Sequence, residues 1–442
     1  MSTTAAPATA ATPRRIATLA LPALVVLAAE PLYVLVDTAV VGHLGRVPLA
    51  ALAVGGTVMT LTAWVGTVVA YGTTGRSARR FGAGDRAAAV AEGVQASWLA
   101  LATGVLVAVA IGIGGGALTR TLVGGPGEVA DAAAGWLRVA ALGAPGLLLA
   151  AAGNGWLRGI QDTRRPLLFV LGPNLLSAVL CPLLVYPAGL GLVGSAVANA
   201  IAQTLSGVLF AAALVRERVS LRPRPRVIGQ QLVLSRDLLV RGVAFQASFL
   251  SATAVAARFG AAAVGAHQIA LQLWFFTVLV LDALAIAAQS LVGAALGGGD
   301  AAGARFLARR VALLGGLCGV AFAVLIAAGA GAGVVPSWFS SDPQVREQAM
   351  TAWPWFVALQ PIGGVVFALD GVLIGAGDVR YLRNLTIVCA FGGFLPAIWL
   401  AYGLELGLGG IWAGLTLFVV LRLAGLLLRM RSGAWAVVGA VR

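Results

Sequence analysis

The chain repeats its own sequence once, at a distance of about half its length. The tripeptide Thr-Ala-Val at 38–40 recurs at 253–255, and the Gly-x-Gly-Asp turn that ends at Asp85 recurs at Asp300. Two copies of one sequence pattern predict two copies of one structural unit. Any fold for this chain must therefore divide into two similar lobes.

The composition excludes a water-soluble protein. Apolar residues make up 60% of the 442 residues, charged residues make up 10%, and the mean hydropathy is +0.95, whereas about a quarter of the residues in soluble domains are charged. We therefore expect a membrane protein that contacts membrane lipids. The net charge of +14 could suggest a nucleic-acid partner, but the arginines lie in short loops between apolar stretches, where membrane topology explains them. No nucleic-acid partner is expected.

Twelve apolar stretches are long enough to cross a bilayer, which needs roughly 20 residues per helix. In the first half they are residues 16–43, 48–75, 90–114, 129–157, 166–187 and 190–215. In the second half they are residues 237–258, 264–295, 306–333, 345–374, 382–404 and 407–430. We therefore expect an all-α polytopic membrane protein with twelve transmembrane helices in two six-helix bundles.

The expected organisation is a tail, two lobes and a linker between them. These segments are residues 1–13 (disordered tail), 14–215 (N-terminal lobe), 216–236 (cytoplasmic linker) and 237–442 (C-terminal lobe). Because each copy has an even number of spans, both copies enter the membrane in the same direction, and a pseudo-two-fold axis along the membrane normal relates them. Rocking of one bundle against the other would then open a central cavity to each side in turn.

The placement of arginine predicts the orientation in the membrane. Most of the 30 basic residues, all of them arginine, lie at the two termini, in the even-numbered loops and in the linker. Loops rich in arginine stay on the cytoplasmic side. Both termini are therefore expected in the cytoplasm, with the chain spanning a bacterial inner (plasma) membrane.

Two acidic residues lie within the first span. An ionisable group in hydrocarbon costs several kcal/mol, so such residues are the first candidates for function. Glu30 and Asp37 are seven residues apart, which places them on one helix face about 10 Å apart along the axis. Tyr33 shares this face, and Pro31 removes a backbone hydrogen bond and offers a hinge between the two acids.

Asp37 is the stronger candidate for coupling transport to an ion. A carboxyl group among apolar side chains can take up and release a proton, so Asp37, and with it Glu30, is a candidate proton or cation carrier. The second copy has Ala252 at the position equivalent to Asp37. A packing role, with the carboxyl group bonded to a neighbouring hydroxyl or amide, is the alternative. The loss of the acid from one copy favours function, because a packing role shared by both lobes would have kept it.

Further polar residues lie within the spans of both lobes. In the N-terminal lobe they could bond Asp37 or line its cavity, and they are Asn154, Asn174, Ser177 and Asn199. In the C-terminal lobe the candidates are His267, Gln268, Asp282 and Asp370. Each of these residues could instead stabilise helix packing by hydrogen bonds.

No catalytic or cofactor-binding motif occurs in the sequence. There is no HExxH, no GxSxG and no Walker lysine. The three cysteines lie in apolar spans without the spacing of metal ligands, so neither a metal site nor a cofactor is expected. The Gly-rich loops at 82–85 and 297–300 are interpreted as helix connections rather than phosphate cradles, because they recur at equivalent turns. We therefore expect a transporter driven by an ion gradient, and no enzyme.

Several motifs resemble one known family. They are Glu30-Pro31, Val-Asp-Thr-Ala-Val-Val-Gly-His-Leu-Gly at 36–45, Leu-Arg-Gly-Ile-Gln-Asp-Thr-Arg at 157–164, Gly-Ala-His-Gln-Ile at 265–269 and Leu-Asp-Ala-Leu-Ala at 281–285. Together they resemble the multidrug and toxic compound extrusion (MATE) transporters, specifically the DinF-like bacterial branch. The resemblance covers about residues 15–430.

The resemblance implies an antiporter that exports small organic compounds, often cationic or amphipathic, in exchange for protons or sodium. Asp37 matches the position that the resemblance implies as the protonation site, and bending of its helix is one proposed response to protonation. Where relatives carry Asn and Asp on the fifth span, this chain has Ser177 and Cys181, and Asn199 matches a relative's threonine. These replacements leave a poorer oxygen cage for sodium and favour protons. We expect a monomer that binds a small-molecule substrate.

Three alternatives remain open at this stage. One is sodium coupling of the same exporter. Another is a flippase for lipid-linked precursors, which would need a cavity lined with cations, whereas Arg258 and Arg422 lie near span ends from which they can reach the membrane surface. The last is a membrane scaffold or receptor, which would show no flux driven by a gradient.

Overall fold

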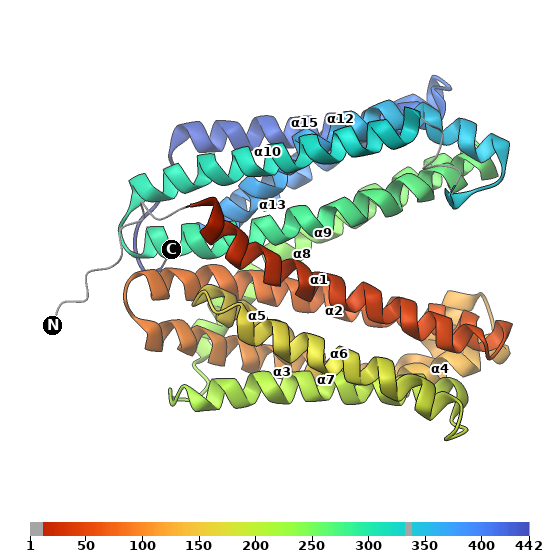
Figure 1. Ribbon diagram of the computed structural model, residues 1–442, viewed down its shortest axis with the longest axis horizontal. Helices are drawn as coiled ribbons and strands as arrows, with labels where there is room; N and C mark the ends of the chain where they lie inside the picture. Colours follow the sequence, from red (N-terminus) through yellow and green to blue (C-terminus); the bar gives the residue numbers. More distant parts are fainter. Residues whose placement is uncertain (1–11, 332–337, 442) are drawn as a thin grey trace. The chain divides into compact units, whose positions relative to one another are not determined.

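The computed structural model describes residues 12–331 and 338–441, and these residues form helices and their connections (Figure 1). The first half contains α1 (Pro13–Gly42), α2 (Arg46–Gly82), α3 (Arg86–Val123), α4 (Glu128–Ala140), the 3-10 turn η2 (Ala141–Gly143), α5 (Ala144–Gly159), α6 (Arg164–Val185) and α7 (Gly191–Arg216). The second half contains α8 (Pro225–Arg258), α9 (Ala261–Gly297), α10 (Ala301–Gly331), α12 (Pro343–Gly375), α13 (Val379–Cys389), the π-helical turn η3 (Ala390–Phe394), α14 (Leu395–Gly403) and α15 (Gly407–Ser432).

Twelve helical segments of the described chain are long and apolar enough to cross a membrane, which confirms the predicted number of spans. Several helices are longer than the apolar stretches that predicted them. For example, α2 extends to Gly82 although the apolar stretch was expected to end at residue 75. Arginine and other good helix formers continue these helices past the apolar segment.

Two of the predicted spans are each interrupted by a short irregular turn. The stretch 129–157 is divided by η2, just before Pro145, and the stretch 382–404 is divided by η3, just before Pro396. Proline lacks a backbone N–H and collides with the preceding turn, so the helix adopts 3-10 or π geometry at these points. Pro31 differs, because it lies inside the uninterrupted α1.

The chain forms two compact units. One comprises Leu21–Ser235, and the other comprises Arg236–Ala440 together with the described residues up to Ala20. The boundary lies inside α8, which begins at Pro225, so the second part of the segment expected as a linker is helical. We refer to Leu21–Ser235 as the first unit and to Arg236–Ala440 as the second unit.

The segment between α7 and α8 is bound along α3 rather than free. The side-chain amide of Gln95 donates to the carbonyl oxygen of Arg222 (3.1 Å), and its oxygen accepts from the backbone N–H of Arg224 (2.6 Å). The indole N–H of Trp98, one turn further along α3, donates to the carbonyl oxygen of Leu221 (2.8 Å). Three side chain to backbone hydrogen bonds therefore hold this segment against the first unit.

The sequence repeat is reproduced in the packing of the helices. In the first unit α5 crosses α2 so closely that a Cβ added to Gly155 would lie 2.7 Å from the carbonyl oxygen of Ala70. In the second unit α12 crosses α9 more closely still, with Gly371 against the carbonyl oxygen of Ala285. Only glycine fits such approaches, which are typical of helix contacts in membranes.

The repeated Gly-x-Gly-Asp loops are helix connections, as predicted. Gly84 and Gly299 both adopt the left-handed conformation, with φ of 82° at each. The carboxylate of Asp85 then accepts a hydrogen bond from the backbone N–H of Ala88 (2.8 Å), and Asp300 accepts in the same way from Gly303 (2.7 Å). Each aspartate thus caps the N-terminus of the following helix.

Candidate functional site

The candidate polar residues of the first unit lie in two groups of side chains. The first, which we call the Asp37 group, comprises Asp37, Tyr33, Ser177, Cys181, Ser195 and Asn199. The second surrounds a cavity beside Glu30 and includes Glu30, Asn154, Arg158, Asn174, Gln203 and Ser206. The sequence predicts one cavity for Asn154, Asn174, Ser177 and Asn199, but the structure divides these residues between the two groups.

Asp37 lies in the interior of the first unit, with 4% of its surface exposed. The Cys181 thiol on α6 donates a hydrogen bond to Oδ1 of Asp37 (3.2 Å). The Ser195 hydroxyl on α7 is within hydrogen-bonding reach of the same carboxyl group, and it accepts from the indole N–H of Trp136 (2.9 Å). Two helices, α6 and α7, therefore place uncharged donors beside the carboxyl group that α1 carries.

Other polar atoms of the Asp37 group retain unused hydrogen-bonding capacity. The hydroxyl of Tyr33 lies close to Asp37, Ser177 and Asn199. Nevertheless Tyr33 Oη, Ser177 Oγ and Asn199 Oδ1 are buried and form no well-aligned hydrogen bond with any residue that the structure describes. Buried polar atoms without partners are costly, so a proton shared among these groups would stabilise them. The site is therefore suited to exchange a proton.

The equivalent position in the second unit has lost this chemistry. Ala252 on α8 is 1% exposed and contributes a methyl group where the first unit has a carboxyl group. Asp37 and Ala252 are thus both buried, and the two units differ in the chemistry of this buried position.

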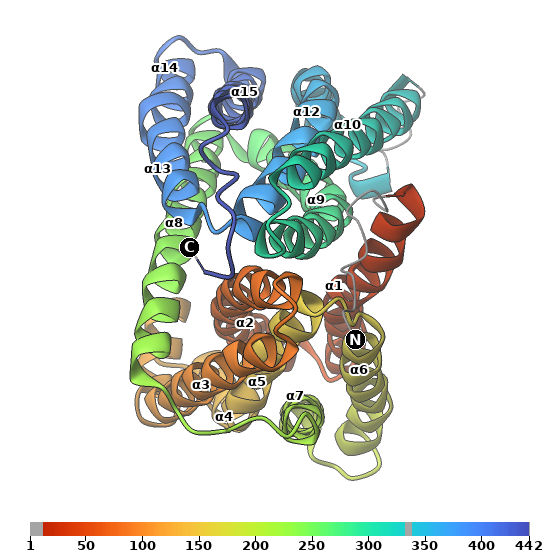
Figure 2. The ribbon, with the colours of Figure 1, turned by 90° about the vertical axis from the view of Figure 1, so that its left-hand side faces the viewer.

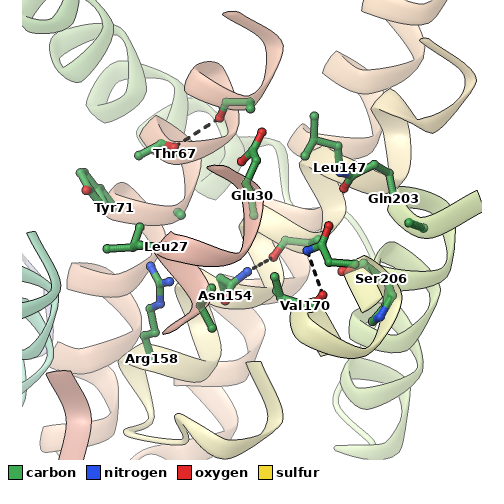
Figure 3. A pocket seen from close by; sticks show the side chains of 18 residues that line it. Leu27, Glu30, Thr67, Tyr71, Leu147, Asn154, Arg158, Val170, Gln203 and Ser206 are labelled. Carbon is green, nitrogen blue, oxygen red and sulfur yellow. Dashed lines mark hydrogen bonds between the residues drawn. The ribbon is translucent and has the colours of Figure 1, made fainter. Parts of the chain in front are cut away.

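The cavity beside Glu30 has a volume of about 150 Å³ (Figure 3). Its walls come from α1, α2, α5, α6 and α7, and apolar side chains such as Leu27, Leu147 and Val170 line part of them. The amide of Asn154 donates to the Ala150 carbonyl oxygen at 3.0 Å, as Figure 3 shows. The cavity is smaller than most small-molecule sites, but its lining has their typical combination of an apolar wall with a few fixed polar groups.

The same cavity carries charges of both signs. Glu30 on α1 and Arg158 near the end of α5 both line it (Figure 3), and Arg158 is only 6% exposed. Arg158 belongs to the motif at 157–164, which by itself does not indicate that its side chain lines a site. Gln203 and Ser206 on α7 were also missed. The four-residue spacing of Ser195, Asn199 and Gln203 places the three on one helix face and could have indicated Gln203.

Asp370 in the second unit is fixed in a buried ion cluster. Its Oδ2 accepts hydrogen bonds from Arg241 on α8 and from Arg422 on α15. The prediction that Arg422 extends to the membrane surface is wrong, because its side chain is 3% exposed and its guanidinium lies 4.9 Å from the centre of the Phe245 ring. A carboxylate held by two guanidiniums favours a structural role over an exchangeable one.

The remaining candidates of the second unit do not gather at one place. His267 is 1% exposed, its ring packs edge-on against Trp412 at 5.9 Å, and neither ring nitrogen has a hydrogen-bond partner among the described residues. Gln268, the next residue, is exposed, and Asp282 is half-buried. The polar interior of this unit therefore offers no counterpart of the Asp37 group at these positions.

Comparison with known proteins identifies the family. The MatE family model matches residues 22–183 and 238–399, one segment in each half of the chain. The chain therefore belongs to the MatE family of MATE transporters and is a multi-pass membrane protein. This confirms the resemblance inferred from the motifs around Glu30, Asp37 and His267.

Relatives and solved structures agree with this assignment over nearly the whole chain. The chain is 32% identical to the chloroplastic protein DETOXIFICATION 44 of Arabidopsis thaliana, covering 95% of this chain and 83% of the relative. It is 31% identical to DNA damage-inducible protein F of Escherichia coli, covering 94% and 92%. A crystal structure of MATE in the bent conformation is similar in fold, with a TM-score of 0.87, 22% identity, and coverage of 95% and 94%.

Proposed function

We propose that the protein is a secondary antiporter that exports small organic compounds, often cationic or amphipathic, in exchange for protons by alternating access. The similarity to a probable multidrug resistance protein, NorM of Thermotoga maritima, supports the cargo class; it is 24% identical over 432 residues. The observation that carries the proposal is the Asp37 group. Its carboxyl group is buried, and the side chains that bond it, Cys181 and Ser195, carry no positive charge.

The Asp37 group provides partners for both protonation states. The ionised carboxylate accepts from the Cys181 thiol and the Ser195 hydroxyl. The protonated form gains one O–H donor, and the Tyr33 hydroxyl close to Asp37 has hydrogen-bonding capacity that is not in use, as do the Ser177 and Asn199 oxygens next to Tyr33. Proton uptake therefore exchanges one set of hydrogen bonds for another and changes the charge of the group at small structural cost.

The cavity beside Glu30 is the proposed cargo site. Glu30 supplies a negative charge that attracts a cationic group, and the apolar wall accepts the hydrophobic part of an amphipathic compound. Glu30 and Asp37 lie on the same helix, with Pro31 between them. A change of α1 at Pro31 upon protonation of Asp37 would therefore alter the position of Glu30 and couple the proton to the cargo.

The chemistry of the Asp37 group favours protons over sodium. A hard cation prefers several oxygen ligands, whereas one of the two side chains bonded to Asp37, Cys181, offers sulfur in place of oxygen. A flippase for lipid-linked phosphates would need a cavity lined with several cations, and Arg158 lines this one together with the opposite charge of Glu30. The exporter is therefore the better-supported function.

We further propose that both termini face the cytoplasm and that the protein acts as a monomer in a bacterial inner membrane. The concentration of arginine at the termini and in alternate loops supports the orientation. In this proposal the proton gradient supplies the driving force, and no bound cofactor takes part.

The test is transport by purified protein in proteoliposomes. Efflux of a fluorescent cationic dye should follow an imposed pH gradient and should not follow a sodium gradient imposed alone. Asp37→Asn should abolish the response to the pH gradient, whereas Asp131→Asn, at a position where 68% of the side chain is exposed, should not. Full proton-driven efflux in Asp37→Asn would refute the proposed coupling. Efflux driven by a sodium gradient alone would show that sodium, and not the proton, is the coupling ion.

A further inference from the structure

A hollow on the first unit brings three arginines together from three helices. Arg86 begins α3, Arg165 lies at the start of α6 and Arg216 ends α7, and the hollow between them has a volume of about 520 Å³. Figure 2 shows α7 beside α6, with α3 on its other side. We propose that this hollow binds the headgroup phosphate of an anionic phospholipid.

The charges in the hollow are organised by one acid. Glu217 accepts from Arg86 (2.9 Å) and from Arg165 (3.1 Å), so a single carboxylate holds two guanidiniums in place. Asp162 contacts Arg165 from outside the lining (3.2 Å). Three guanidiniums against these two carboxylates leave an excess of positive charge, and each guanidinium has five N–H donors, more than these contacts use. A phosphate in the hollow would accept from the remaining donors.

The surroundings of the hollow match a lipid better than a soluble anion. Phe169 and Ala213 form its apolar wall, and the Phe169 ring packs edge-on against Phe210 at 5.3 Å. Next to them Leu168 on α6 is 67% exposed and Val215 on α7 is 57% exposed. In a membrane protein such apolar faces contact acyl chains. A ligand with a phosphate at one end and hydrocarbon at the other fits this combination, as in other basic pockets between transmembrane helices.

The sequence repeat indicates that the helices can begin at these positions without the arginines of the hollow. The positions of the second half equivalent to Arg86 and Arg165 are Ala301 and Tyr381. Helices α10 and α13 nevertheless begin there in the same way as α3 and α6. A role in membrane orientation alone would need arginine in the loops, but it would not need arginines from three helices around one hollow.

The proposal can be tested by lipid binding without any gradient, so its outcome is independent of the proposed transport function. Purified full-length protein in detergent is titrated with short-chain phosphatidylglycerol, with phosphatidylcholine of the same chains, and with glycerol phosphate, while thermal stability reports binding. Phosphatidylglycerol should stabilise the protein at lower concentration than either control. An equal effect of glycerol phosphate would assign the hollow to a soluble anion and overturn the proposal.

Removing an arginine and removing the acid should change the affinity for phosphatidylglycerol in opposite directions. An ion pair with only a structural role would not give opposite changes. Arg216→Gln should raise the apparent Kd for phosphatidylglycerol about fivefold, since one basic residue near a membrane surface contributes about 1 kcal/mol. Glu217→Gln should lower this Kd, because it removes the competing carboxylate. Arg309→Gln, an exposed arginine on α10, is the matched control and should leave the Kd unchanged. Equal losses in Arg216→Gln and Arg309→Gln, or weaker binding in Glu217→Gln, would contradict the proposal.

Discussion

The buried ion cluster around Asp370 allows a test of whether this carboxylate has a structural role, in contrast to the proton-exchanging role proposed for Asp37. The side chains of Asp370, Arg422 and Arg241 are 6%, 3% and 12% exposed. Replacing Asp370 by asparagine removes the carboxylate that the two buried guanidiniums share, and breaking a buried pair in this way costs about 3–5 kcal/mol. Arg241→Gln leaves Asp370 bonded to Arg422, so the loss should be close to that of one charged hydrogen bond, about 1.5–3 kcal/mol.

The free energy of unfolding can be measured in detergent by titration with a denaturing detergent, and transport can be measured on the same preparations. Asp370→Asn should be the less stable variant, yet the protein that remains folded should keep its response to a pH gradient. Two results would refute this reasoning. One is an equal loss of stability in Asp370→Asn and Arg241→Gln, and the other is a stable Asp370→Asn protein that no longer responds to the gradient.

Three further predictions concern the first unit. Gly155→Val should lower the thermal unfolding temperature, because overpacking costs about 1–3 kcal/mol, whereas Gly112→Ala, whose Cβ would meet open space, should not; equal effects would contradict the close approach of α5 to α2. Glu30→Gln should raise the KM for a cationic dye more than it lowers kcat, and a change in kcat alone would argue against a cargo role. Cys181→Asp should add an oxygen ligand beside Asp37 and introduce a response to sodium in flux assays; a purely proton-driven variant would show that ligand type does not set the ion.

The sequence predicted those features that depend on local pattern and on the repeat. Counting apolar stretches gave the number of membrane-crossing helices, because a bilayer sets the length of each one. The recurrence of Asp85 at Asp300 identified two equivalent turns, and both aspartates cap a helix. Asp37 could be selected because the aligned halves show an acid within an apolar span of one copy and Ala252 at the equivalent position of the other.

Features that depend on contacts between distant segments could not be read from the sequence. Arg422 and Asp370 are 52 residues apart, and nothing in their local sequence indicates that they pair. The assignment of Asn154 to the Glu30 cavity depends on the rotation of α5 against α1, which an apolar span does not specify. The start of α8 was missed because arginine-rich sequence near a membrane resembles a loop, although arginine is also a good helix former.

The position of the unit boundary within α8 means that the two copies are not exchangeable modules. The first turns of α8 belong to the first unit and the remainder to the second, so separating the halves at residue 236 would cut a continuous helix and expose its backbone groups. A split protein would have to be divided between residues 219 and 224, which lie outside the helices. A cut before residue 221 would also separate Gln95 and Trp98 on α3 from their backbone partners. Gene duplication has thus produced a protein whose halves share one structural element.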